Sequence, residues 1–308
     1  MRPDQGSSCS SALNYICRET SWNIQSFFYF PNEDKGRTDL MHPKRIRPVQ
    51  HIRAMPRGSS RPQKILFSDG RQYIVKFKNN ARQGTRALVN EYVAGQLAQL
   101  LSLPVPRFKV VDIPKTFIQS NKILSQYAFT PGHQFASEVI HPCEQLPETR
   151  PIPKELNIVN RSQCPGIVVF DQWIHNIDRL KRNVLLQPQP RKGGYKLYII
   201  DHGHSFSFET PSHKRRCSWT PYTLKFLPQK IKPNSLYNWI ARHARNSDDF
   251  FKFVDHIQRI PDERICQIIA SIPHDWNVSR GERTALFTYL QRAKKRLPRL
   301  IARYLRKS

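Results

Sequence analysis

Three polar side chains in the middle of the chain have the types and the spacing of a magnesium site. Asp178 and Asn183 share one loop after a helical pattern, and Asp201 follows an apolar run at the end of a β-hairpin pattern. Two carboxylates and an amide supply the oxygen ligands that Mg²⁺ prefers in proteins. The same group could orient a hydroxyl nucleophile. The surrounding stretch, Phe170–Phe208, is therefore the one that the rest of the chain must position.

A loop of small residues lies upstream, at Gly58, Ser59 and Ser60, and a lysine follows it on a predicted strand. Backbone N–H groups and hydroxyls in such a loop could surround phosphate oxygens. Lys76 on the strand could then contact the same phosphates from below. Lys78 has the same alternation and thus shares the face of Lys76, so the pattern does not choose between the two lysines.

Glu91 is the only acid in the strongest helical pattern of this half, which runs over residues 86–101. A helix glutamate at this distance from a strand lysine could pair with it and fix it on phosphates. The alternative is an exposed helix residue with no such role. The loop and the lysine upstream favour the pair.

Apolar periodicity predicts a small α+β lobe followed by a mostly helical half. Strands are predicted over 49–54, 64–67, 73–77, 108–113 and 123–129, with the helix over 86–101 between the third and the fourth. Backbone groups between Gln126 and Phe129 are candidates for adenine contacts, and Thr130–His133 is interpreted as the connector between lobes. Further helices are predicted over 166–176, 236–244, 248–257, 262–272 and 280–304.

This reading predicts three ranges with different roles. Residues 1–40, which are Ser-rich and aperiodic, are interpreted either as a flexible extension or as sequence upstream of a start at Met41. Residues 41–130 are predicted to form the N-terminal nucleotide-binding lobe. Residues 131–308 are predicted to form the helical C-terminal lobe with the catalytic loop and the metal site.

The composition limits the class of protein. Net charge is +27, which attracts polyanions without specifying which. The six cysteines form no C-x-x-C pair and no zinc-finger spacing, as expected of reduced thiols in a cytoplasmic protein. Neither a signal peptide nor an apolar run long enough to span a membrane is apparent in the sequence.

The last predicted helix carries a basic face. Leucine and isoleucine recur along one side of it, and no acid follows Arg283. A solvated amphipathic helix is one interpretation, and a polyanion-binding surface is the other. The basic residues are Arg292, Lys294, Lys295, Arg296, Arg299, Arg303, Arg306 and Lys307.

Taken together, these motifs resemble the HipA-like kinase family and, more distantly, type II phosphatidylinositol 4-kinases. The resemblance covers roughly residues 45–300. It rests on Pro56–Ser60, Tyr73–Asn79, Asn90-Glu91-Tyr92, Asp171-x-Trp173, Asn176-x-Asp178-Arg179-x-x-x-Asn183, Ile200-Asp201-His202-Gly203 and Ile272-Pro273-x-x-Trp276. The Asn-x-Asp-Arg, Asn and Asp-x-Gly set is specific, whereas the Gly-Ser-Ser loop is not.

The resemblance implies a two-lobed protein-kinase-like α+β fold that uses ATP and Mg²⁺ to phosphorylate a hydroxyl, most simply Ser/Thr of a protein. By position, Asp178 would be the catalytic base, Asn183 and Asp201 would ligate Mg²⁺, and Glu91 would steady Lys76 on the α/β-phosphates. The loop Gly58–Ser60 would cover the phosphates. Relatives of the HipA toxin also imply a DNA-binding antitoxin-type partner. The chain departs from ordinary protein kinases, because it lacks His-Arg-Asp, Asp-Phe-Gly and G-x-G-x-x-G.

Three alternatives stay open at this point. The acceptor could be a small molecule or a lipid instead of a protein. The net charge of +27 is also compatible with a basic nucleic-acid-binding protein or a pseudokinase adaptor. A metal hydrolase would use His175, His202 and His204, although no third ligand has the spacing of a zinc site.

Overall fold

The computed structural model describes residues 46–56, 60–78, 85–146, 151–153, 156–206, 208–209, 215–216, 231 and 234–306. The chain divides into two units at residue 40, and every described residue belongs to the second, Met41–Ser308. The predicted extension over 1–40 lies outside the described residues, and so do Gly58 and Ser59 of the predicted phosphate loop.

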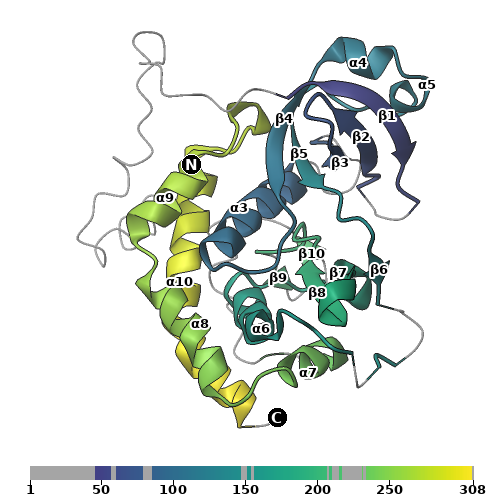
Figure 1. The fold of residues 1–308 in the computed structure, drawn as a ribbon. Coiled ribbons are helices and arrows are strands. Elements are labelled where there is room, and N and C mark those ends of the chain that lie inside the picture. The colour runs from purple at the N-terminus through teal and green to yellow at the C-terminus, as the bar shows by residue number, and fades with distance from the viewer. Residues whose placement is uncertain are drawn as a thin grey trace, which may run out of the picture. The chain divides into compact units, whose positions relative to one another are not determined.

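A five-stranded antiparallel sheet forms the β-rich lobe (Figure 1). The strand order is β1-β2-β3-β5-β4, so the last strand inserts between β3 and β4. Alternation in the sequence explains the pairing, because Ile65, Phe67, Tyr73 and Val75 all point to one buried face. The strands are β1 (Pro48–Ala54), β2 (Gln63–Phe67), β3 (Gln72–Lys76), β4 (Phe108–Ile113) and β5 (Gly132–Glu138).

The strand predicted over 123–129 is wrong, because this segment forms the short helix α5 (Lys122–Ser125) and a turn. The side chain of Asn121 caps the helix by accepting hydrogen bonds from the amides of Ile123 and Leu124, both at 3.0 Å. With α4 (Lys115–Gln119), this helix supplies Ile118 and Leu124 to the sheet core. The fifth strand is β5 instead, so the connector predicted at Thr130–His133 is also wrong, and the sheet extends to Glu138.

Helix α3 (Arg86–Leu100) contacts both β5 of the sheet and α9 of the helical lobe. The predicted helix is confirmed, but it is buried almost all round and has no clear amphipathic side. Tyr92 of this helix packs edge-on against Trp276, with ring centroids 5.9 Å apart. The Tyr92 hydroxyl lies 2.8 Å from the Ser271 hydroxyl. Both layers therefore fix the position of this helix.

The helical lobe packs around the fully buried helix α6 (Cys164–Trp173), which contacts α7, α8 and α10. The indole of Trp173 donates to the carbonyl of Leu290 at 3.1 Å. The remaining helices are α7 (Ser235–Ala241), α8 (Asp248–Arg259), α9 (Asp262–Ala270) and α10 (Arg280–Leu305), with single turns η1 (Arg161–Gln163), η2 (Lys181–Asn183), η3 (Pro190–Lys192) and η5 (His274–Trp276).

The predicted hairpin downstream of α6 is confirmed. It consists of β7 (Val184–Gln189) and β8 (Gly194–Ile199), which pair antiparallel, and β6 (Glu144–Gln145) adds to β7. A separate pair is formed by β9 (Phe208–Glu209) and β10 (Arg215–Arg216). No helix in the part of the chain that the structure describes is long and apolar enough to cross a membrane.

The basic face predicted on α10 needs one correction. Lys294 is buried, and its ammonium donates to the carbonyl of Ile260 at 2.6 Å. It therefore links α10 to the end of α8 and does not belong to a surface. The helix is continuous through Pro298 and begins with a capping box between Ser279 and Glu282.

Candidate active site

Lys76, at the end of β3, lies between two carboxylates from distant parts of the chain. Its ammonium pairs with Glu91 on α3 and lies 2.8 Å from Oδ1 of Asp201, which follows β8. The structure therefore brings together the lysine, the helix glutamate and the aspartate that the sequence analysis singled out. Lys78 pairs with Asp275 instead, so the structure distinguishes the two lysines that the alternation did not.

Charge compensation favours the ionised forms of Lys76 and Asp201 in this buried cluster. Burial alone would lower the pKa of Lys76, but Asp201 and Glu91 outweigh it and hold the pKa above its usual value. Burial would raise the pKa of Asp201, yet the Lys76 ammonium holds it well below its usual range. Glu91 is more deeply buried, and desolvation raises its pKa despite the attraction of Lys76. Asp201 therefore offers an ionised carboxylate, which suits a site for a cation.

The loop after α6 links Asp178 to Asn183, and Asn183 to Ile200, the residue before Asp201. The Asn183 side-chain amide donates to the carbonyl of Asp178 at 2.6 Å, and Ile200 donates its N–H to the Asn183 carbonyl at 3.0 Å. The amide oxygen of Asn183 lies on the other branch of the same group and is the atom that could ligate a metal. Asp178 is also held by Asn176, whose Oδ1 accepts the Asp178 N–H at 3.1 Å.

Asp201 has a left-handed backbone conformation, with φ of 61°. This conformation is rare outside glycine and costs about 1–3 kcal/mol, and such residues concentrate at functional sites. Gly203, two residues later, sits close to α3, where an added Cβ would lie 3.4 Å from Oε1 of Glu91. The Asp-x-Gly segment is thus fitted closely against the helix that carries Glu91.

Arg179 ties the loop to the helix and to the hairpin, a role that the sequence analysis did not assign. It is almost fully buried, and its guanidinium forms a two-pronged ion pair with Asp171 of α6, at 2.8 and 3.1 Å. It also donates to the carbonyls of Asn183, at 3.2 Å, and Ile200, at 2.7 Å. The sequence analysis singled out Asp171 in the motif Asp171-x-Trp173. The motif alone does not indicate which arginine pairs with Asp171.

His202 connects the loop to α3. Its backbone N–H donates to Oε2 of Glu91 at 3.1 Å, and its Nε2 lies 3.0 Å from a guanidinium nitrogen of Arg179. Burial and the charge of Arg179 hold the pKa of His202 well below its usual value, so the ring is neutral and Nε2 accepts from Arg179. This contact gives no support to the alternative of a zinc ligand, and the described residues contain no group of three His, Cys, Asp or Glu side chains placed for a metal.

Among the described residues, the other predicted site residues form no hydrogen bond with Lys76, Glu91 or Asp201. Ser60 is buried in the turn before β2, and its two loop neighbours lie outside the described residues. Gln126 ends α5, and the ring of Phe129 stacks on Phe77 in the sheet core at 4.1 Å. Gln126 and Phe129 were predicted as adenine contacts because they were placed on a strand, and the structure has no strand there. The link that leaves the sheet starts after Glu138, in a Pro-interrupted segment without a clear pattern.

Comparisons with known proteins assign this chain to a family. A sequence profile for the HipA-like kinases matches residues 49–305. The chain belongs to the HipA-like kinase family. The match includes the residues described above, from Lys76 to Asp201, and extends through α10. None of the curated proteins matches the sequence.

Solved structures agree with a kinase fold. The Helicobacter pylori proinflammatory kinase CtkA is similar with a TM-score of 0.51 at 15% identity, over 83% of this chain and 94% of that one. The Golgi casein kinase gives 0.47 at 10% identity, over 83% and 74%. Shewanella oneidensis HipA, solved with HipB and operator DNA, gives 0.42 at 12% identity, over 95% and 83%. At 15% identity, the likeness to CtkA shows only that this HipA-like kinase has the same fold.

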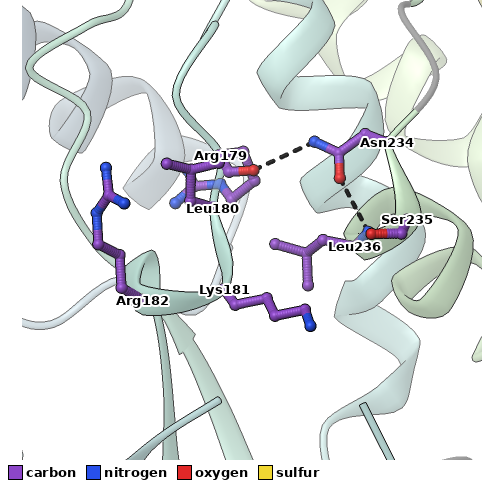
Figure 2. A pocket seen from close by; sticks show the side chains of 7 residues that line it. All are labelled: Arg179, Leu180, Lys181, Arg182, Asn234, Ser235 and Leu236. Atoms are coloured by element: carbon purple, nitrogen blue, oxygen red, sulfur yellow. Dashed lines mark hydrogen bonds between the residues drawn. The ribbon is translucent and has the colours of Figure 1, made fainter. Parts of the chain in front are cut away.

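A pocket lies between the loop and the start of α7 in this HipA-like kinase (Figure 2). The loop residues 179–182 form one wall and residues 234–236, at the start of α7, form the other. The amide of Asn234 donates to the carbonyl of Arg179 at 3.2 Å, and its Oδ1 accepts from the N–H of Leu236 at 2.9 Å. The pocket is therefore part of the same packed unit as the loop that carries Asp178.

Proposed function

We propose that this HipA-like kinase uses Mg²⁺ and ATP to phosphorylate a serine or threonine hydroxyl of a protein. The observation that carries the proposal is the contact of Lys76 with both Glu91 and Asp201. Three elements far apart in the sequence converge on one ammonium, as a nucleotide-phosphate site requires. Membership of a kinase family supports the reaction class.

The donor set supports a magnesium site. Asp201 offers a carboxylate, and Asn183, whose carbonyl accepts from the N–H of the preceding Ile200, offers an amide oxygen. Mg²⁺ is usually held by one or two carboxylates together with water and substrate phosphates, and it does not need a complete cage of protein ligands. The described residues supply no third acidic, His or Cys ligand in a group, so further ligands would come from phosphates and water.

The residues divide the work as follows. ATP would supply the phosphoryl group, and Mg²⁺ held by Asn183 and Asp201 would neutralise charge on its phosphates. Lys76 binds the α- and β-phosphates, and Glu91 holds the lysine in position. Asp178, beside the acceptor hydroxyl, orients it and takes its proton. By the family resemblance, Ser60 with its neighbours Gly58 and Ser59 would belong to the loop that covers the phosphates.

The Ser/Thr acceptor follows from the family resemblance. A small molecule or lipid stays the alternative within the kinase class. A DNA-binding antitoxin-type partner and a cytoplasmic location also remain predictions. The complex with HipB and operator DNA was observed for Shewanella oneidensis HipA.

Phosphoproteomics of cells that express wild type or Asp178→Ala tests the acceptor class. We expect phosphoserine or phosphothreonine sites on a limited set of proteins in the wild-type sample alone. Identical phosphoproteomes, with both proteins expressed to the same level, would rule out a protein acceptor in that cell. A metabolite or lipid extract from the same cultures then tests the alternative acceptors.

A further inference from the structure

The segment that begins with Asp201 has an unfavourable backbone conformation at both of its ends. Asp201 has φ of 61°, and Phe206 has φ of 57°. Both values lie in the left-handed region, which a residue with a side chain seldom adopts unless the surrounding structure holds it there. Residues 201–206, called here the 201–206 segment, therefore need contacts with other elements to keep this conformation.

Helix α3 supplies such contacts through Asn90. Its side chain is completely buried, and its amide nitrogen donates to the carbonyls of Gly203 and Ser205, both at 2.8 Å. A side-chain amide carries two N–H donors, so both of them are used on this one segment. The two carbonyls follow Asp201 closely in the chain. Asn90 thus holds the backbone directly after the proposed metal ligand.

Glu91, the next residue on α3, divides its contacts between two elements. Its Oε2 accepts the N–H of His202 at 3.1 Å, and its Oε1 pairs with Lys76 on β3. Both hydrogen bonds that Asn90 donates go to the 201–206 segment. A change at Asn90 therefore acts on the segment and leaves the contact between Glu91 and Lys76 in place.

Space filling alone does not explain an asparagine at this position. Burial of an amide is unfavourable unless the amide is hydrogen-bonded, and an apolar residue would fill the same space. Gly203 and Ser205 are themselves buried, so their carbonyls would lose a donor in the interior if Asn90 were apolar. The segment would then leave its left-handed conformation more often, and the Asp201 carboxylate would leave the site with it.

We propose that Asn90 is a positioning residue that holds the carboxylate of Asp201 in place for Mg²⁺. The proposal rests on the kinase function argued above, because that function makes Asp201 a metal ligand. It gives separate roles to two neighbours in the motif Asn90-Glu91-Tyr92. Glu91 holds Lys76 for the phosphates, and Asn90 holds Asp201 for the metal, so one turn of α3 fixes both groups.

The test measures how ATP turnover by the full-length protein depends on free Mg²⁺ at a fixed ATP concentration. Asn90→Leu keeps the branched shape of the side chain and removes both donors. The Mg²⁺ concentration for half-maximal rate should rise about tenfold, because two hydrogen bonds that hold the ligand are lost. Tyr92→Phe, the matched control, removes a hydrogen bond between the same helix and Ser271 and should keep the wild-type Mg²⁺ dependence.

A second measurement does not depend on turnover. Hydrogen exchange without nucleotide, followed by mass spectrometry, reports on the backbone N–H groups of the 201–206 segment. The N–H of Phe206, for example, donates to the carbonyl of Ile174 at 2.7 Å. Asn90→Leu should accelerate exchange in this segment by about tenfold and leave exchange in α8 unchanged.

Asn90→Ser is measured beside Asn90→Leu, so that a failure of the leucine variant to fold does not remove the test. Its hydroxyl ends one bond short of the asparagine amide nitrogen, and it introduces no apolar group. Both measurements should change in the same direction as in Asn90→Leu.

A general loss of stability would lower the rate at every Mg²⁺ concentration without a shift in the half-maximal concentration. The proposal is overturned if the folded Asn90 variants keep the wild-type Mg²⁺ dependence or the wild-type exchange of the 201–206 segment. It is also overturned if Tyr92→Phe shifts the Mg²⁺ dependence equally. Absence of ATP turnover in wild type would contradict the kinase function itself, and the exchange measurement would still decide whether Asn90 holds the segment.

Discussion

Lys76 and Lys78 lie two residues apart with the same charge, yet their partners differ completely. Lys76 contacts Glu91 and Asp201, whereas Lys78 contacts Asp275 in η5. Alternation along a strand assigns a face but says nothing about which residue the face meets. At this scale, the identity of the site depends on partners 15 and 125 positions away in the sequence.

The lysine pair gives a matched test of the nucleotide site. Lys76→Met should lower kcat/KM for ATP by about 10²-fold or more, because one preorganised donor to developing charge is lost. Lys78→Met removes the same charge two residues away and should leave kcat/KM for ATP within about threefold of wild type. Steady-state ATP turnover checks both, and equal losses in the two variants would contradict the assignment.

The Asp171–Arg179 ion pair is the second feature at residue scale. Both side chains are completely buried, and Tyr237 donates a further hydrogen bond to Asp171 at 3.2 Å. Burial would lower the pKa of Arg179, but Asp171 more than compensates, so the guanidinium stays charged. Removal of the carboxylate alone would leave a buried cation without a partner.

Asp171→Ala should therefore lower the free energy of unfolding by about 3–5 kcal/mol. Replacement of both partners, in Asp171→Leu with Arg179→Met, should cost less than the single change because no buried charge remains. Denaturant unfolding measured by fluorescence compares the two. A single variant within about 0.5 kcal/mol of wild type would show that the pair does not stabilise the loop.

At the scale of elements, local patterns predicted the parts with one buried face and missed the parts defined by distant contacts. Strands β2 and β3 were predictable because Ile65, Phe67, Tyr73 and Val75 alternate. The helix at 122–125 was missed because it is a single turn, and the apolar residues of 123–129 also fit a strand. The last strand of the sheet, β5, was missed because it inserts between two earlier strands and begins at Gly132, directly after Pro131.

The contact between the sheet and η5 could not be read from the sequence at all. Asp275 accepts hydrogen bonds from Lys78 and from the N–H of His133, the latter at 3.0 Å, and the indole of Trp276 donates to the His133 carbonyl at 2.8 Å. Gly132 leaves room for this approach, because a Cβ there would lie 2.6 Å from Oδ2 of Asp275. The start of β5 is thereby fixed to the helical lobe.

This contact predicts an acid-sensitive contribution to stability. Burial would raise the pKa of Asp275, but Lys78 and His133 outweigh it and hold the pKa below its usual value. Because the pKa of Asp275 is lower in the folded state, the contact adds stability at a pH above the unfolded-state pKa of about 3.9. This stability is lost as the pH falls through the folded-state pKa. Asp275→Asn should cost about 1–2 kcal/mol at pH 7.

The difference between wild type and Asp275→Asn should then shrink between about pH 5 and pH 3. Urea unfolding across this range measures it. Asp112→Asn, an exposed carboxylate on β4, serves as the control and should show no such convergence. A constant difference between wild type and Asp275→Asn at every pH would contradict the ionic character of the contact.

For the whole molecule, the fold class and the order of the functional motifs were predictable, and the architecture that joins the lobes was not. Asp178, Asn183 and Asp201 share one loop and one hairpin, so their proximity follows from local sequence. The network through Arg179 and His202 joins α6, α3 and the hairpin, and each of its hydrogen bonds spans residues without a common pattern. Family membership then identifies the reaction class.

Phosphoryl transfer that depends on Asp178 is the central claim, and one comparison tests it most directly. The rate of transfer of labelled γ-phosphate from Mg·ATP is measured for wild type, Asp178→Asn and Asp255→Asn. Asp255 is an exposed residue on α8 and serves as the control. Asp178→Asn keeps the shape of the side chain and the backbone contacts to Asn176 and Asn183. We predict a rate lower by about 10²–10⁴-fold in Asp178→Asn, with unchanged thermal unfolding and a wild-type rate in Asp255→Asn. Equal rates in all three proteins would contradict the account.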